Sequence, residues 1–194
     1  MTGYNTQYQV EENLFGAPYP EFAAFLKEHA HAGGSALDLG CGQGRDALLL
    51  AEYGYTVTGV DASQVGINQM LQRAQTANLA VKGVNVDMHH YELAQCFDAI
   101  VLDSILHFGK ADREKELILL DNVSAHLNLN GYLFLFIHKS PLKEKALRDW
   151  FAALGPHFKL VKDGYIDYVY EEKSTGFRSQ SPFYMFIVKR VNSA

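Results

Sequence analysis

The stretch that decides the fold runs from Ser35 to Asp61 and reads SALDLGCGQGRDALLLAEYGYTVTGVD. It opens with a short apolar run and continues through three glycines at alternate positions, Gly40, Gly42 and Gly44. Residues 45–53 then show helix-like apolar spacing, and a second apolar run follows that ends on an acid. The order of strand, tight loop, helix and strand predicts half of a nucleotide-binding α/β sheet.

The loop in this stretch has the chemistry of a ligand cradle. Glycines allow positive φ and lack the Cβ atoms that would keep a ligand from the backbone. The loop leads into a helix N-terminus, whose free N–H groups suit a negatively charged group. Asp61, at the end of the second strand, can accept two hydrogen bonds from a ribose diol. The dinucleotide fingerprint would place its third glycine where Arg45 stands, which favours a different nucleotide cofactor.

The pattern Asp38-x-Gly40-x-Gly42-x-Gly44, with Asp61 downstream, resembles the class I S-adenosylmethionine-dependent methyltransferases. The resemblance implies S-adenosylmethionine as cofactor. It also implies an α/β fold, a Rossmann-like three-layer sandwich. Its sheet would have seven mostly parallel strands in the order 3-2-1-4-5-7-6, with the last strand antiparallel.

The rest of the chain suits this fold, and the resemblance covers nearly all of it from Phe22 onward. Helices are predicted at 21–29, 64–76, 111–127 and 141–154. Strand-like runs follow the opening stretch at 81–86, 97–103, 131–137, 158–162, 165–170 and 183–189. No repeat, low-complexity tract or linker separates these elements. We therefore expect one domain over residues 1–194.

The resemblance also assigns cofactor contacts by position. Ala62, after the ribose acid, would pack against the adenine; Asp87 would accept from its exocyclic amine, with Met88 beside it. The alternative for Asp87 is a cap for the residues that follow it. Asp103, at the end of the fourth strand, would contact the methionine portion or the substrate. The expected cofactor-binding set is Asp38, Gly40, Cys41, Gly42, Gly44, Asp61, Ala62, Asp87, Met88, Asp103 and Ser104.

The segment 1–20 is polar and aromatic and is the candidate for a lid over the cofactor. By the same resemblance, Tyr4 and Tyr8 would reach the cofactor or substrate; the alternative is that they pack on the edge of the sheet. His107 and Phe108 follow the fourth strand and are candidates for the substrate pocket, because ligands bind at the carboxyl ends of parallel strands.

Composition excludes several classes of function. The 194 residues are 48% hydrophobic with a net charge of -5, which argues against a general nucleic-acid or membrane-surface binder. Two cysteines give neither a disulfide framework nor a metal quartet, and the histidines lack zinc-site spacing. We expect no metal, a cytoplasmic protein without a signal peptide or membrane span, and a monomer or homodimer.

Transfer of a methyl group from a sulfonium by in-line displacement needs alignment and water exclusion more than acid–base chemistry. The catalytic residues therefore stay unknown, with His107 and His138 as candidate bases or pocket-lining residues. The Asn-Pro-Pro-Tyr signature of nucleobase and glutamine N-methyltransferases is absent after the fourth strand. A small-molecule acceptor is therefore favoured.

The run Gly-Cys-Gly-Gln-Gly-Arg-Asp most resembles the small bacterial methyltransferases of the tellurite-resistance and thiopurine group. Two alternatives remain open. The first is a nicotinamide-dependent oxidoreductase, against which Arg45 counts. The second is a non-catalytic protein that binds S-adenosylmethionine.

Overall fold

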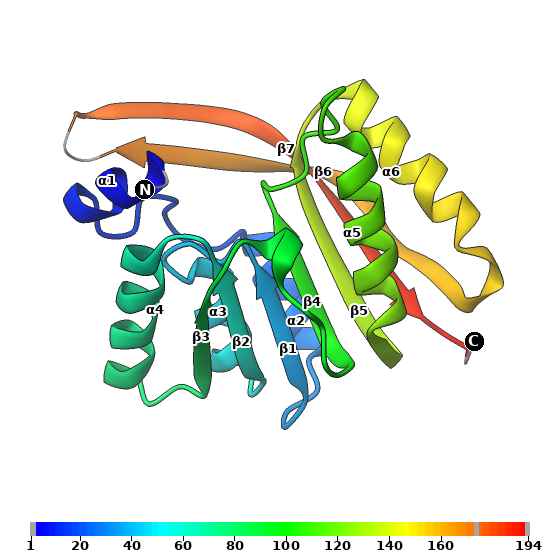
Figure 1. Ribbon diagram of the computed structural model, residues 1–194, viewed down its shortest axis with the longest axis horizontal. Helices are drawn as coiled ribbons and strands as arrows, with labels where there is room; N and C mark the ends of the chain where they lie inside the picture. Colours follow the sequence, from blue (N-terminus) through cyan, green and yellow to red (C-terminus); the bar gives the residue numbers. More distant parts are fainter. Residues whose placement is uncertain (1–2, 173–174, 193–194) are drawn as a thin grey trace.

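The computed structural model describes residues 3–172 and 175–192. Within these residues, seven strands form one sheet in the order β3-β2-β1-β4-β5-β7-β6 (Figure 1). β1 to β5 pair in parallel, and β7 is antiparallel to both β5 and β6. The predicted sheet order is therefore confirmed. The strands are β1 Ser35–Leu39, β2 Thr56–Asp61, β3 Val81–Asn85, β4 Phe97–Asp103, β5 Leu127–His138, β6 Phe158–Glu172 and β7 Phe177–Arg190.

Helices cover both faces of the sheet and complete the predicted three layers. They are α2 Pro20–His29, α3 Arg45–Glu52, α4 Gln64–Thr76, α5 Arg113–Ala125 and α6 Pro141–Ala153, whereas α1 Gly3–Val10 lies at the edge of the sheet under the hairpin of β6 and β7 (Figure 1). Short 3₁₀ turns follow β3 and α6, at Met88–His90 and Gly155–His157. One apolar core lies between the sheet and α2, α3 and α4, and a second lies between the sheet and α5 and α6. Strands buried on both faces explain the near-continuous apolar runs of the sequence.

Several element boundaries differ from the prediction. The helix predicted over 111–127 spans only 113–125, and β5 begins at Leu127 rather than at residue 131. Leu127 is fully buried and pairs with Phe97. Its apolar side chain therefore fits both the spacing of a helix and the spacing of a strand. The runs at 158–162 and 165–170 form one strand, β6, and β7 begins at Phe177 rather than at residue 183.

The extra length of β6 and β7 makes a hairpin that leaves the sheet and reaches over α1 (Figure 1). Tyr168 and Tyr170 of this hairpin meet the segment after α1: the Tyr168 hydroxyl donates to the Phe15 carbonyl, and the Phe15 and Tyr170 rings lie 6.3 Å apart. The N-terminal segment, predicted as a lid over 1–20, thus lies between the hairpin and the carboxyl edge of the parallel strands. Residues 1 and 2 of that prediction lie outside the described residues.

Gly66 tests how tightly α4 packs against the glycine loop. A Cβ atom at Gly66 would lie 2.6 Å from the carbonyl oxygen of Gly42. Alanine is about 1 kcal/mol better than glycine inside a helix. Even so, we expect Gly66→Ala to lower the free energy of unfolding by about 1–3 kcal/mol, because the backbone of the loop must shift. Urea unfolding measures the difference.

Gly164→Ala is the matched control, since a Cβ atom there meets nothing within 4 Å. It should change the free energy of unfolding little. A Gly66→Ala protein as stable as the parent would show that the loop can yield without cost.

Candidate active site

The glycine loop lies at the carboxyl ends of β1 and β2. Gly40, Gly42 and Gly44 all adopt positive φ, of 74°, 52° and 84°, which explains the alternation in the sequence. This path turns the Gly42 N–H toward Asp61, whose Oδ2 accepts it at 2.9 Å. Cys41 is buried inside the loop, and burial raises the pKa of its thiol.

Two of the glycines also allow side chains that line the cleft to lie close above the loop. A Cβ atom at Gly40 would lie 2.5 Å from the Ile105 side chain, and one at Gly42 would lie 2.6 Å from the Tyr8 hydroxyl. Gly44 differs, because its missing Cβ makes room for Met70 of α4. Gly40 and Gly42 therefore shape a cleft, whereas Gly44 serves helix packing.

Asp61 presents a partly engaged carboxylate to this cleft. Its Oδ1 accepts from the Ser63 N–H at 2.7 Å, and its Oδ2 accepts from Gly42. Burial raises the pKa of Asp61, although these two backbone donors act in the opposite direction. A carboxylate has about four acceptor positions, so Asp61 retains capacity for two further donors. A ribose diol would need that number.

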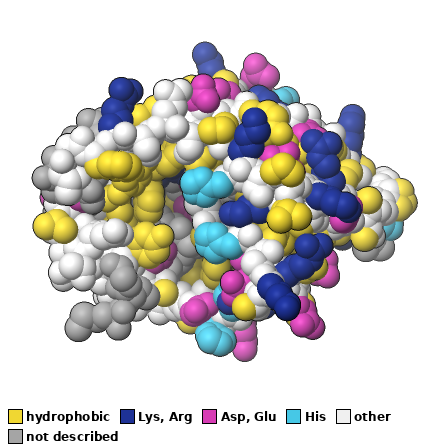
Figure 2. Space-filling view, turned by 90° about the horizontal axis from the view of Figure 1, so that it is seen from above, with side chains coloured by type: hydrophobic (Ala, Val, Ile, Leu, Met, Phe, Trp, Pro, Cys, Tyr) yellow, Lys and Arg dark blue, Asp and Glu magenta, His cyan; other side chains and the backbone are white. Residues whose placement is uncertain are grey.

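The predicted cofactor residues gather around two adjoining cavities, of about 130 Å³ under the lid and about 320 Å³ toward β3. Both are lined by Tyr4, Gly40, Asp61 and Ile105. The first is also lined by Tyr8, Cys41, Gly42, Asp103 and Ser104. The second is also lined by Ala62, Asp87 and Met88. Figure 2 shows a hollow on this face, with hydrophobic side chains inside it and histidine side chains at its edge.

Several predicted residues do not line either cavity. Asp38 lies beneath the loop, 2% exposed, and burial followed by Asp46 raises its pKa well above the ordinary value. His107, Phe108 and His138 lie at the same edge of the sheet but outside both cavities. His107 and Phe108 have their backbone N–H groups bound by the buried carboxylate of Glu116, at 2.9 and 2.6 Å.

Asp87 caps the residues that follow it and also lines a cavity. Its Oδ1 accepts from the His89 N–H at 2.9 Å, which is the capping alternative. The residue also lines the cavity toward β3, where the resemblance places the adenine. A cap uses only part of the acceptor capacity of a carboxylate, so the two roles are compatible.

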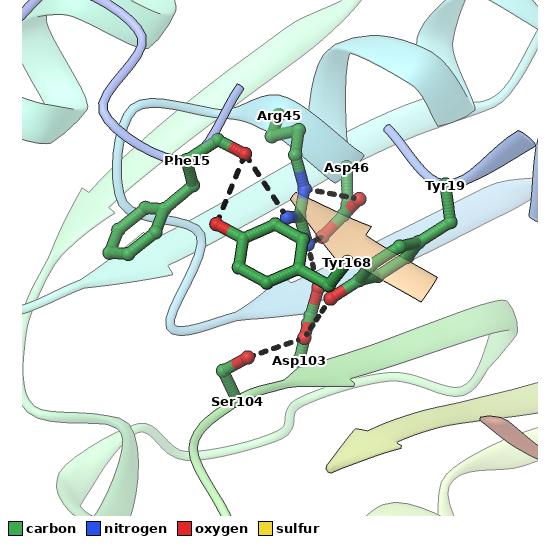
Figure 3. Close-up of polar contacts among 7 residues, drawn as sticks. All are labelled: Phe15, Tyr19, Arg45, Asp46, Asp103, Ser104 and Tyr168. Carbon is green, nitrogen blue, oxygen red and sulfur yellow. Dashed lines mark hydrogen bonds and ion pairs between the residues drawn. The ribbon is translucent and has the colours of Figure 1, made fainter. Parts of the chain in front are cut away.

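Arg45 is the residue that the sequence analysis missed (Figure 3). Its side chain donates to both carboxylate oxygens of Asp46, at 3.1 and 2.9 Å, and forms an ion pair with Asp103. Its guanidinium carbon lies 4.6 Å from the ring centroid of Tyr19 and 5.7 Å from that of Tyr168. Burial alone would lower the pKa of Arg45, but Asp46 and Tyr19 outweigh it and the pKa is raised.

The same cluster fixes Asp103 at the end of β4. Its Oδ1 accepts from the Tyr19 hydroxyl at 3.3 Å and from the Ser104 hydroxyl at 2.8 Å. Arg45 in turn donates to the Phe15 carbonyl at 3.4 Å. Burial raises the pKa of Tyr168 to about 12. The cluster thus joins α3, β4, the N-terminal segment and β6 at one point (Figure 3).

Among the described residues, no helix is long and apolar enough to cross a membrane. Nor does that part of the chain contain a group of three or more His, Cys, Asp or Glu residues that could hold a metal ion.

The Arg45 cluster should carry much of the stability of this edge. Arg45→Gln would leave Asp46 and Asp103 buried without their cation. We therefore expect a loss of about 3–5 kcal/mol in the free energy of unfolding, as for other broken buried pairs. Denaturant unfolding at pH 7 measures it.

Arg148→Gln is the matched control. Arg148 also pairs with an acid, Asp163 at 3.1 Å, and lies over a tyrosine ring, but its side chain is 55% exposed. A solvated pair of this kind should contribute less than about 1 kcal/mol. Equal losses in the two variants would contradict the importance given to burial.

Comparison with known proteins bears directly on this site. Residues 36–131 match the family described as methyltransferase domain. The chain is 32% identical over 96 residues to the probable S-adenosyl-L-methionine-dependent methyltransferase TehB of Haemophilus influenzae, covering 50% of this chain and 33% of that protein. The matched part therefore spans about a third of that relative's length.

Solved structures show the same fold. TehB from Haemophilus influenzae aligns with a TM-score of 0.73 at 21% identity, over 97% of this chain and 67% of that one. The 1,6-didemethyltoxoflavin-N1-methyltransferase of Burkholderia thailandensis, solved with 1,6-didemethyltoxoflavin and S-adenosylhomocysteine, aligns with a TM-score of 0.64 at 18% identity. That alignment covers 89% of this chain and 78% of the other. The chain therefore belongs to the class I S-adenosylmethionine-dependent methyltransferases, of the TehB type.

Proposed function

We propose that this chain transfers a methyl group from S-adenosylmethionine to a small-molecule acceptor by in-line displacement. One observation carries the proposal: the glycine loop, Asp61, Asp87 and Asp103 come from separate strand ends and line two adjoining cavities. A cofactor with a nucleoside at one end and an amino acid at the other suits such an elongated site. A nicotinamide cofactor is disfavoured by the family.

The residues present fit that cofactor. Asp61 keeps two free acceptor positions for a ribose. A side chain in place of Gly40 or Gly42 would collide with Ile105 or Tyr8, which line the same cavity. Ala62 and Met88 offer apolar contact in the cavity toward β3, where Asp87 can accept a hydrogen bond. Ser104 and Asp103 would face the methionine end.

When bound, S-adenosylmethionine supplies a methyl group on a sulfonium, which is already activated for transfer. The chain then has to align the acceptor and exclude water. Tyr4 and Tyr8 of α1 cover the glycine loop, and the β6–β7 hairpin lies over α1. The N-terminal segment therefore acts as the lid.

Two observations support a small acceptor. The space beside Ser104 lies under Tyr4, Tyr8 and Phe15 of the lid, and the methyltransferase of Burkholderia thailandensis with its bound 1,6-didemethyltoxoflavin shares this fold. An acceptor that must lose a proton would need a base. His138 and His107 at this edge of the sheet are the candidates, and burial, followed by Lys143 and His107, lowers the pKa of His138. The His138 ring is then neutral at pH 7.

Asp61→Ala tests the cofactor site. The change removes the acceptor for the ribose, and we expect the Kd for S-adenosylmethionine to rise at least about tenfold, since hydrogen bonds to charged groups contribute about 1.5–3 kcal/mol. Calorimetric titration measures the Kd, with NAD as the comparison ligand. Asp149→Ala, an exposed acid on α6, is the control. Unchanged affinity in Asp61→Ala would remove Asp61 from the site.

His138→Asn tests the base. With the parent protein and an acceptor that must be deprotonated, kcat should be constant from pH 6.5 upward and fall only as the pH drops through the pKa of His138, which lies below the ordinary 6.5. The variant should lose about a hundredfold in kcat at pH 7 and lose this acid limb. If His107→Asn shows a similar loss of kcat, and kcat of His138→Asn still falls at low pH, the base is His107 and not His138.

A further inference from the structure

Gln43 stands between two left-handed glycines, and its side chain leaves the loop toward the N-terminal segment. It is only 5% exposed. Its Oε1 accepts from the Leu14 N–H at 2.7 Å, and its Nε2 donates to the Glu11 carbonyl at 2.6 Å. The same Nε2 also donates to Oε1 of Gln69 on α4, at 2.9 Å. Both hydrogens of this amide are therefore used.

Gln69 continues the chain of amides. Its Nε2 donates to the Tyr8 carbonyl at 2.7 Å. Exchanging the oxygen and nitrogen of Gln69 would set an NH₂ group against that of Gln43 and an oxygen against the Tyr8 carbonyl, so only one orientation satisfies both ends. We call Gln43 and Gln69 the amide latch. It holds the backbone of Tyr8, Glu11 and Leu14.

The latch controls where the lid meets the cleft. Tyr8, whose carbonyl it holds, is 3% exposed and places its hydroxyl over Gly42. Gly42 binds Asp61, and its neighbour Gln43 binds the lid. Gly42, which shapes the cofactor site, and Gln43, which holds the lid, are therefore consecutive in the chain, so a shift of one moves the other.

The closed lid leaves little room. The cavity under it measures about 130 Å³, whereas small-molecule sites commonly measure about 300–1,000 Å³. A cofactor that spans this cavity and the adjoining one of about 320 Å³ has least room beside Gly42, where the Tyr8 hydroxyl lies, so its entry there needs the N-terminal segment to move. Because the latch spans the loop and this segment, its hydrogen bonds must yield when the segment opens and form again when it closes.

We propose that Gln43 and Gln69 are positioning residues whose amide chain couples closure of the N-terminal segment to the cofactor loop and sets how long the cofactor stays bound. The inference rests on the proposed function for the identity of the cofactor. The contacts that carry it belong to the protein alone, so the latch can be tested with and without ligand.

The first experiment measures amide hydrogen exchange of residues 4–15 without ligand. In Gln69→Ala the Tyr8 carbonyl loses its donor and the Gln43 amide loses one acceptor, so exchange in this segment should speed up about fivefold to tenfold. Alanine suits a helix, so the variant should fold. Gln72→Ala, a glutamine on the exposed side of the same helix, is the matched control and should behave as the parent. Unchanged exchange in Gln69→Ala would overturn the latch.

The second experiment measures release of S-adenosylhomocysteine by stopped-flow. We expect release about fivefold to tenfold faster in Gln69→Ala than in the parent or Gln72→Ala, with an almost unchanged thermal midpoint. In Gln69→Glu a carboxylate oxygen faces the Tyr8 carbonyl oxygen and repels it, so its release rate should be at least as fast as in Gln69→Ala. A merely structural role would move the midpoint without changing the release rate.

The outcomes separate the two proposals. If the parent protein binds no S-adenosylhomocysteine, the proposed cofactor fails, and the exchange measurement alone decides whether the amides hold the segment. If the parent binds it and releases it at the same rate as Gln69→Ala, the cofactor stands and the coupling is overturned.

Discussion

The buried guanidinium of Arg45 is the interaction on which the rest of the site depends. A cation in the interior is costly unless carboxylates and hydrogen bonds surround it. Asp46 and Asp103 supply the charge, Tyr19 and Tyr168 supply ring faces, and the Phe15 carbonyl takes a further hydrogen bond. Because these partners come from the two ends and the middle of the chain, satisfying one side chain brings together the loop, the fourth strand, the lid and the hairpin.

The lid and the cofactor loop are thus joined in two places. Arg45 reaches the lid from the start of α3, and the amide latch reaches it from within the loop. The first junction is ionic and deeply buried, while the second consists of neutral amides, one of them half-buried on α4. Neutral amide hydrogen bonds exchange more readily with water than a buried ion pair. The arrangement suits a lid with a fixed base and a movable front.

The strands and the acids at their ends could be predicted from local patterns, and the strand order followed from the family resemblance that the glycine loop and Asp61 carry. Asp61, Asp87 and Asp103 stand directly after apolar runs, and parallel strands bring such positions to one edge. Arg45 could not be assigned its partners, since Tyr19 and Tyr168 lie far from it in sequence and no spacing links them. Gln43 was read only as part of a loop, because its acceptors are backbone atoms that any residue provides.

The boundaries that the sequence analysis missed have a related cause. Periodicity reports burial, and residues 177–182 of β7 are mostly exposed. This part of β7 is polar apart from Phe177 and Pro182, so it carries no apolar alternation that a pattern could detect. The boundary at Leu127 was missed for the opposite reason. Leu127 is buried at the junction of a helix and a strand, so its apolar side chain fits both the helical spacing and the strand spacing.

The contact between Tyr168 and Phe15 has a consequence for synthesis of the protein. Chains emerge from the ribosome N-terminus first, at about 5–20 residues per second. The glycine loop and the first four strands are complete long before Tyr168 appears. Until then Phe15 and Arg45 lack one of their partners. During synthesis there is thus a period in which the glycine loop, the N-terminal segment and both residues of the amide latch are present, while the hairpin that lies over them is still missing.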